Sequence, residues 1–146
     1  MLEENFNELK ELLKEELNFD PTSYTNMQEK ISQIPNLQQY FLTIYIEEKS
    51  LLNDYEENLK QLYAETYHKY KFPKQGDGIE FEYSLDTKNE IHLYVEGNKK
   101  FVEKSLIVQK QKLQVEFLDK SLQNIRDMQW ALKVAIDQRK FFEGLN

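Results

Sequence analysis

The residues best suited to binding chemistry lie between Tyr63 and Lys74, where lysines alternate with aromatic side chains. Single-stranded nucleic acid presents phosphates together with unstacked bases, so ammonium groups can contact the phosphates and ring faces the bases. On these residues alone a structural interpretation is the more common one: the tyrosines are core residues, and the lysines interact with the last carbonyls of a helix. The candidate DNA-binding residues are Lys69, Lys71, Lys74, Tyr67, Tyr70, Phe72 and His68.

A second basic segment spans residues 98–114, which carry five lysines and one glutamate. Its ordinary interpretation is a solvated helix face. Both basic segments are short, but in an oligomer several weak contacts would act together, because binding at one subunit raises the effective concentration at the next. The lysines are Lys99, Lys100, Lys104, Lys110 and Lys112.

Several kinds of catalytic site are excluded by composition. The chain has no cysteine and two histidines, which rules out thiol chemistry and leaves little for a histidine metal cage. The glycine pair at Gly76 and Gly78 lacks the Lys-Ser/Thr of a phosphate loop. Adjacent carboxylates such as Glu47 and Glu48 are common on solvated helices, although a metal-dependent enzyme that uses carboxylates stays an alternative. We therefore expect no ATP hydrolysis and no cofactor, and nothing in the sequence singles out a metal site.

The overall composition indicates one domain built mainly from long helices. The chain has 146 residues, of which 40% are hydrophobic and 13% aromatic, with only four glycines and three prolines. Its net charge of −7 is unevenly distributed, because residues 1–65 carry fourteen acidic and five basic residues. No apolar run is long enough for a membrane span and no signal peptide is evident, so we expect a soluble intracellular protein.

Hydrophobic spacing predicts three helical segments in the first half. Leucines at intervals of three and four predict an amphipathic helix over 2–17. A short second helix is expected over 22–33, and Pro35 is expected to begin a long helix that covers 36–71.

The centre of the chain is predicted to form a β-hairpin. Ile79, Phe81 and Tyr83 alternate with glutamates, and apolar residues alternate again over 91–95. These elements divide the chain into a helical region, 1–74, a loop and hairpin, 75–97, and a long helix or helix pair, 98–146. The expected fold is therefore mainly α, coiled-coil-like, with one hairpin.

The last helical segment, 98–143, carries a wide apolar face, with a break near Gln114 left open. This face has more apolar surface than one partner helix is expected to cover, which suggests self-association. The residues expected to form the contact between copies are Phe117, Leu118, Leu122, Ile125, Met128, Leu132, Ile136 and Phe142.

The C-terminal segment 116–144 resembles the end of UvsY-type recombination mediators of tailed phages. A second stretch, Ile34–Tyr40, looks like the start of the long helix in that family. The C-terminal resemblance is carried by Glu116-Phe117, Ile125, Trp130-Ala131-Leu132-Lys133 and Arg139-Lys140-Phe141 with Gly144.

The resemblance implies a protein that binds single-stranded DNA and is not an enzyme. It implies a closed ring of roughly six or seven copies held by the C-terminal helix. It also implies two protein partners, a RecA-like phage recombinase and the phage single-strand-binding protein, in the cytoplasm of an infected bacterial host. The family's DNA-binding stretch corresponds to Tyr63–Lys74 here, with the basic residues shifted a few positions along the chain. The alternative is a coiled-coil scaffold or assembly chaperone that does not contact DNA.

Overall fold

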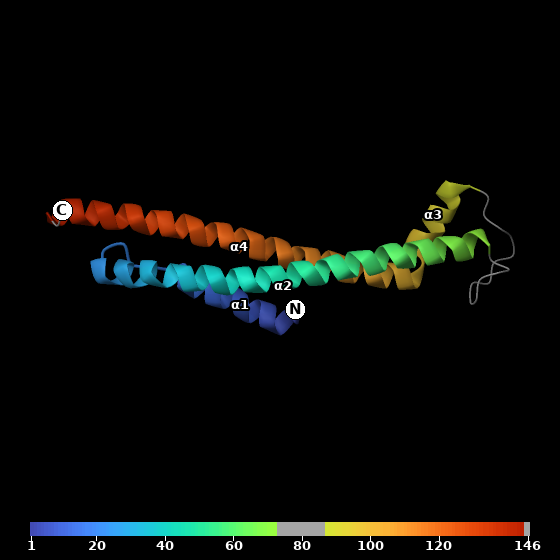
Figure 1. The fold of residues 1–146 in the computed structure, drawn as a ribbon, viewed down its shortest axis with the longest axis horizontal. Coiled ribbons are helices and arrows are strands. Elements are labelled where there is room, and N and C mark those ends of the chain that lie inside the picture. The colour runs from blue at the N-terminus through green and yellow to red at the C-terminus, as the bar shows by residue number, and fades with distance from the viewer. Residues whose placement is uncertain (73–86, 145–146) are drawn as a thin grey trace. The chain divides into compact units, whose positions relative to one another are not determined.

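The computed structural model describes residues 1–72 and 87–144, and the regular structure in these ranges is helical (Figure 1). The expected strand over 79–83 lies outside the described residues, as do the loop before it and Lys74. The elements are α1, Glu3–Glu16; α2, Tyr24–Lys71; α3, Lys88–Gly97; and α4, Lys99–Glu143.

Helix α1 confirms the amphipathic pattern expected at the start of the chain. Glu3 and Glu4 occupy its first turn, where negative charge interacts favourably with the helix dipole. Leu9 and Leu13, one turn apart, are each 5% exposed and form the buried side of the helix.

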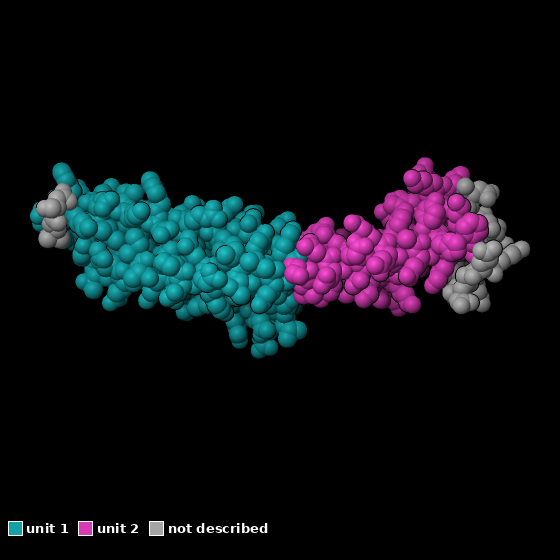
Figure 2. Space-filling view, in the orientation of Figure 1, with its two compact units in different colours: residues 1–49, 114–146 teal, residues 50–113 magenta. Residues whose placement is uncertain are grey.

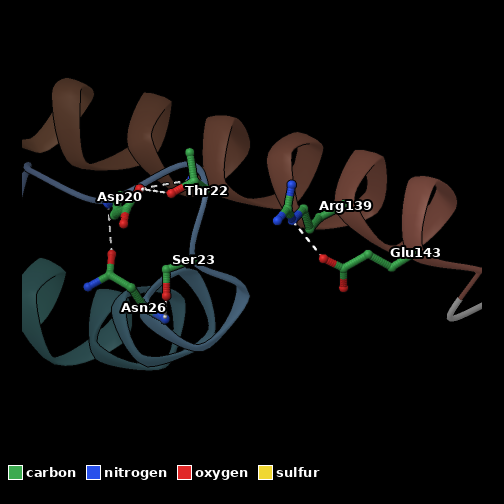
Figure 3. A network of polar contacts seen from close by, with 6 residues as sticks. All are labelled: Asp20, Thr22, Ser23, Asn26, Arg139 and Glu143. Atoms are coloured by element: carbon green, nitrogen blue, oxygen red, sulfur yellow. Dashed lines mark hydrogen bonds and ion pairs between the residues drawn. The ribbon is translucent and has the colours of Figure 1, made fainter.

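A polar turn joins α1 to α2 (Figure 3). The Asp20 carboxylate accepts hydrogen bonds from the backbone N–H of Thr22 at 2.9 Å and from its hydroxyl at 2.7 Å. The Asp20 N–H donates to Oδ1 of Asn26 at 2.8 Å, and the Asn26 N–H donates to the Ser23 hydroxyl at 3.2 Å. The bonds from Thr22 hold the pKa of Asp20 below its ordinary value. The Ser23 hydroxyl thus satisfies one of the free N–H groups in the first turn of α2, that of Asn26.

Helix α2 runs without interruption through Pro35, whereas a new helix was expected to begin there. Proline removes one helical hydrogen bond and costs about 3 kcal/mol inside a helix. Burial on both sides of it offsets that cost, since Met27 is 0%, Ile34 1% and Phe41 0% exposed. Each such side chain contributes about 1.5–3 kcal/mol when fully buried. The separate short helix over 22–33 is therefore part of α2.

The predicted β-hairpin is wrong, because residues 91–95 belong to helix α3. Ile91 is 2% and Val95 0% exposed, whereas Leu93 between them is 68% exposed. The two buried residues are thus four positions apart, which is a helical spacing and not the alternation of a strand. The Thr87 side chain caps the helix by accepting a hydrogen bond from the Glu90 N–H at 3.2 Å.

Helix α4 is continuous, which settles the open question of a break near Gln114. The side chain of Gln114 is 4% exposed, and its Nε2 donates to the Met1 carbonyl at 3.2 Å. The helix ends before Gly144, whose φ of 68° is readily adopted only by glycine.

The chain forms two compact units (Figure 2). Unit 1 comprises Met1–Lys49 and Gln114–Asn146, and unit 2 comprises Ser50–Leu113. Each unit has its own hydrophobic cluster, built from residues distant in sequence. The buried members in unit 1 are Leu9, Leu13, Met27, Ile34, Phe41, Leu118, Ile125, Met128, Leu132 and Ile136.

Candidate nucleic-acid interface

The described part of the predicted binding segment lies at the end of α2, in unit 2, where the structure separates its side chains into two groups. The lysines remain accessible to solvent, Lys71 being exposed and Lys69 half-buried. His68 and Phe72 are also exposed, Phe72 at 42%. The two tyrosines lie on the other side and pack inside the unit.

Tyr70 is a core residue of unit 2. It is 9% exposed and clusters with Ile91 and Val95 of α3. Tyr67 is half-buried and packs against the same cluster, with its ring centroid 6.1 Å from that of Tyr63. These contacts occupy much of both ring surfaces, so little of either is left for a base.

The exposed rings at the end of α2 form a small group of their own. The ring centroids of His68 and Phe72, one turn apart, are 5.0 Å from each other at an interplanar angle of 52°. The ammonium group of Lys71 lies 5.6 Å from the centre of the Phe72 ring. An exposed ring beside an ammonium group can stack on a base while the cation contacts a phosphate.

Helix α3 is attached to α2 by a polar contact that the sequence did not predict. The Tyr63 hydroxyl and Nδ1 of His92 share a hydrogen bond of 2.8 Å, and Nε2 of His92 lies 3.1 Å from the Glu96 carboxylate. Desolvation raises the pKa of Tyr63, with smaller contributions from Tyr67 and Glu96. The tyrosine hydroxyl therefore stays protonated around neutral pH and holds α3 in place.

The beginning of α4 lies at the end of α2. The side chain Nδ2 of Asn98 is 3.4 Å from the Tyr70 hydroxyl. Its Oδ1 accepts hydrogen bonds from the N–H groups of Lys100, at 3.1 Å, and Phe101, at 3.3 Å. One asparagine thus caps α4 and joins it to the predicted binding segment.

The residues predicted to join copies through α4 are divided between the interior and the surface. Phe117 and Leu122 are partly buried against the core of unit 1, whereas Phe142 is 80% exposed. Trp130 and Phe141, which are not among the predicted contact residues, are 69% and 71% exposed. Five members are at most 6% exposed within a single chain and belong to that core: Leu118, Ile125, Met128, Leu132 and Ile136.

No group of three or more acidic or histidine side chains with metal-binding geometry occurs in residues 1–72 and 87–144. In the same ranges, no helix is both long and apolar enough to cross a bilayer.

Comparison with known proteins gives one family and one fold. Residues 12–145 match the family model described as "Recombination, repair and ssDNA binding protein UvsY". Crystal structures of the recombination mediator protein UvsY of bacteriophage T4 are similar over nearly the whole chain. One has a TM-score of 0.77 at 22% identity and covers 92% of this chain and 98% of that one. Another has a TM-score of 0.79 at 22% identity and covers 98% of both. No curated protein matches in sequence.

Proposed function

This chain belongs to the UvsY family of recombination, repair and single-stranded DNA-binding proteins, and from that premise we propose that it is a recombination mediator. It binds single-stranded DNA and promotes loading of a RecA-like recombinase onto strands coated by a single-strand-binding protein, in the cytoplasm of an infected bacterial host. The observation that carries the proposal is the family match over residues 12–145, together with the shared fold.

The distribution of charge supports DNA contact in unit 2. Its described residues carry nine lysines and seven acidic residues, whereas those of unit 1 carry nine basic and fifteen acidic residues. Phosphate binding depends on local rather than net charge. The proposed contacts are made by Lys69, Lys71 and Lys74, with Phe72 and His68 as the stacking rings.

Self-association is part of the proposed mechanism, because one such site is small. Copies of the chain assemble through the outer surface of α4, where Trp130, Phe141 and Phe142 present exposed rings. A ring of copies presents several sites of moderate affinity to one strand. Binding at one site raises the effective concentration at the next, so the overall affinity is high. This binding competes with the coating protein for the strand. Direct contact with the recombinase favours formation of the recombinase filament. Neither step requires bond chemistry.

The decisive experiment measures binding of a fluorescently labelled oligo(dT) by anisotropy over a range of salt concentrations. Wild-type protein should bind with an affinity that falls as salt rises. The triple variant K69A/K71A/K74A should bind more weakly with unchanged assembly mass. A matched control, K14A/K120A/K133A, removes three exposed lysines from unit 1 and should retain most of the affinity.

The results separate the mediator from a scaffold that does not contact DNA. Absence of binding by the wild-type protein at low salt would refute the proposal and favour the scaffold. Equal isotherms for the triple variant and the wild type would remove the end of α2 from the site.

A further inference from the structure

We propose that the start of α4 supplies a second set of phosphate contacts, from Lys99, Lys100 and Lys104, so that the DNA site spans two helix ends. This inference rests on the single-stranded DNA binding proposed above and extends it to residues about thirty positions further along the chain. Nothing in the spacing of the two segments in the sequence requires them to meet.

The first argument is the placement of α4 against α2. The hydrogen bond between Asn98 and the Tyr70 hydroxyl, 3.4 Å long, lies between the two basic segments. Lys69 and Lys71 flank Tyr70, and Lys99 and Lys100 directly follow Asn98. The two pairs of ammonium groups are therefore carried by adjacent helix ends.

The second argument is that this placement is fixed by packing. Phe101, in the first turn of α4, packs against the cluster formed by Tyr70, Ile91 and Val95. Its ring centroid lies 5.9 Å from that of Tyr63 on α2. A lysine stem anchored on a packed helix loses less freedom on binding than one on a mobile segment, which favours a defined phosphate contact.

The third argument is the availability of the charges. Lys99, Lys100 and Lys104 are all exposed, and none forms an ion pair with another described residue. Lys112, further along the same helix, is paired with Glu56 at 3.2 Å. Glu103 is the one acidic residue among the five lysines of the segment 98–114, so the segment carries an excess of positive charge.

The exposed rings favour a nucleic acid over an acidic protein segment as the ligand. A purely electrostatic partner would need the lysines alone. Here the Phe72 ring, 42% exposed and beside His68, accompanies the cations at the neighbouring helix end. A site for single-stranded nucleic acid combines cations that contact the phosphate backbone with aromatic rings that stack on the bases.

The test compares K99A/K100A/K104A with wild type in the full-length assembly, using labelled oligo(dT) and a salt titration. Each phosphate contact with a single strand contributes about 0.7 to the slope of log affinity against log salt. Loss of three contacts should therefore lower that slope by about two for each engaged subunit. The arginine variant K99R/K100R/K104R should retain the wild-type slope. The control K14A/K120A/K133A removes the same charge. Its slope of log affinity against log salt should stay within about half a unit of the wild-type slope.

Circular dichroism and sedimentation verify that each variant folds and assembles as wild type does. A wild-type slope in K99A/K100A/K104A, with normal binding by wild type, overturns this inference and leaves the proposed function standing. Loss of recombinase or coating-protein binding with unchanged oligonucleotide affinity would assign these lysines to a protein contact and overturn it as well. Failure of wild type itself to bind oligo(dT) would refute the proposed function, and this inference with it.

Discussion

Replacing Leu132 by alanine should destabilise unit 1 itself, although the residue lies on the helix expected to join copies of the chain. Leu132 is 0% exposed and belongs to the hydrophobic cluster of unit 1. The change removes three carbon atoms, worth about 2.4 kcal/mol at ~0.8 kcal/mol per buried methylene. The cavity adds to that loss, and comparable substitutions cost ~2–5 kcal/mol. We therefore expect the free energy of unfolding to fall by about 3 kcal/mol.

Thermal unfolding followed by circular dichroism measures this effect. For a chain of this length, about 3 kcal/mol corresponds to a fall in Tm of roughly 6–12 °C. The matched control is Leu106→Ala, the same change on the same helix at a side chain that is 58% exposed. Surface substitutions of this kind usually alter stability by less than ~0.5 kcal/mol.

The opposite behaviour is expected of Phe142→Ala, because that ring is 80% exposed. It should reduce the assembly mass in sedimentation at low protein concentration and leave far-UV dichroism unchanged. The reasoning fails if Leu132→Ala keeps the wild-type Tm while the assembly dissociates. That result would mean that Leu132 contacts a second copy and not the core of its own chain.

Three further changes test local features. Thr87→Ala should remove the cap of α3, cost about 1 kcal/mol and speed amide exchange in that helix. Tyr70→Phe should keep the unit 2 core but lose the bond to Asn98, which lowers stability in urea by about 0.5–1.5 kcal/mol. Because Thr22 lowers the pKa of Asp20 from 3.8, ionised Asp20 stabilises the fold above that pH, and the effect is lost as pH falls through the lowered pKa. Asp20→Asn should abolish this acid-side dependence, and NMR titration of the wild-type carboxyl should give a midpoint below 3.8.

The sequence predicts α1 correctly because its apolar residues recur at helical spacing. In α1 the buried residues Leu9 and Leu13 are members of the predicted stripe. Helix α4 ends at Glu143, as predicted for the segment 98–143, because Gly144 after it adopts the left-handed conformation that favours glycine.

The predicted hairpin failed because residues 91–95 fit two periods at once. Ile91, Leu93 and Val95 alternate with polar or aromatic residues, but Ile91 and Val95 are also one helical turn apart. The decisive local signal was Thr87 followed three residues later by Glu90, the pattern of a capping box. A helix start therefore competed with the turn that the hairpin required, and packing against Tyr70 of α2 favoured the helix.

The wide apolar face of α4 predicts a contact between copies, but periodicity indicates only that a residue is buried and not which partner buries it. Ile125 and Leu132 are covered by the chain's own helices, together with Ile34 and Phe41 of α2. A sequence cannot distinguish these cases, since a contact within the chain and a contact between copies bury the same residue types. The exposed rings at Trp130 and Phe141 become a candidate interface only after the internal partners are known.

The candidate DNA-binding segment shows how helical spacing could have separated its two groups of rings in advance. Tyr63, Tyr67 and Tyr70 follow one another at intervals of four and three, so they form a single stripe on α2 and pack together. His68 and Phe72 are four apart on another stripe, which the structure leaves exposed. Aromatic content alone therefore overstates the stacking surface. The rings that can stack on a base are those outside the packed stripe. The lysines can contribute phosphate contacts because they lie at the same exposed end of the helix.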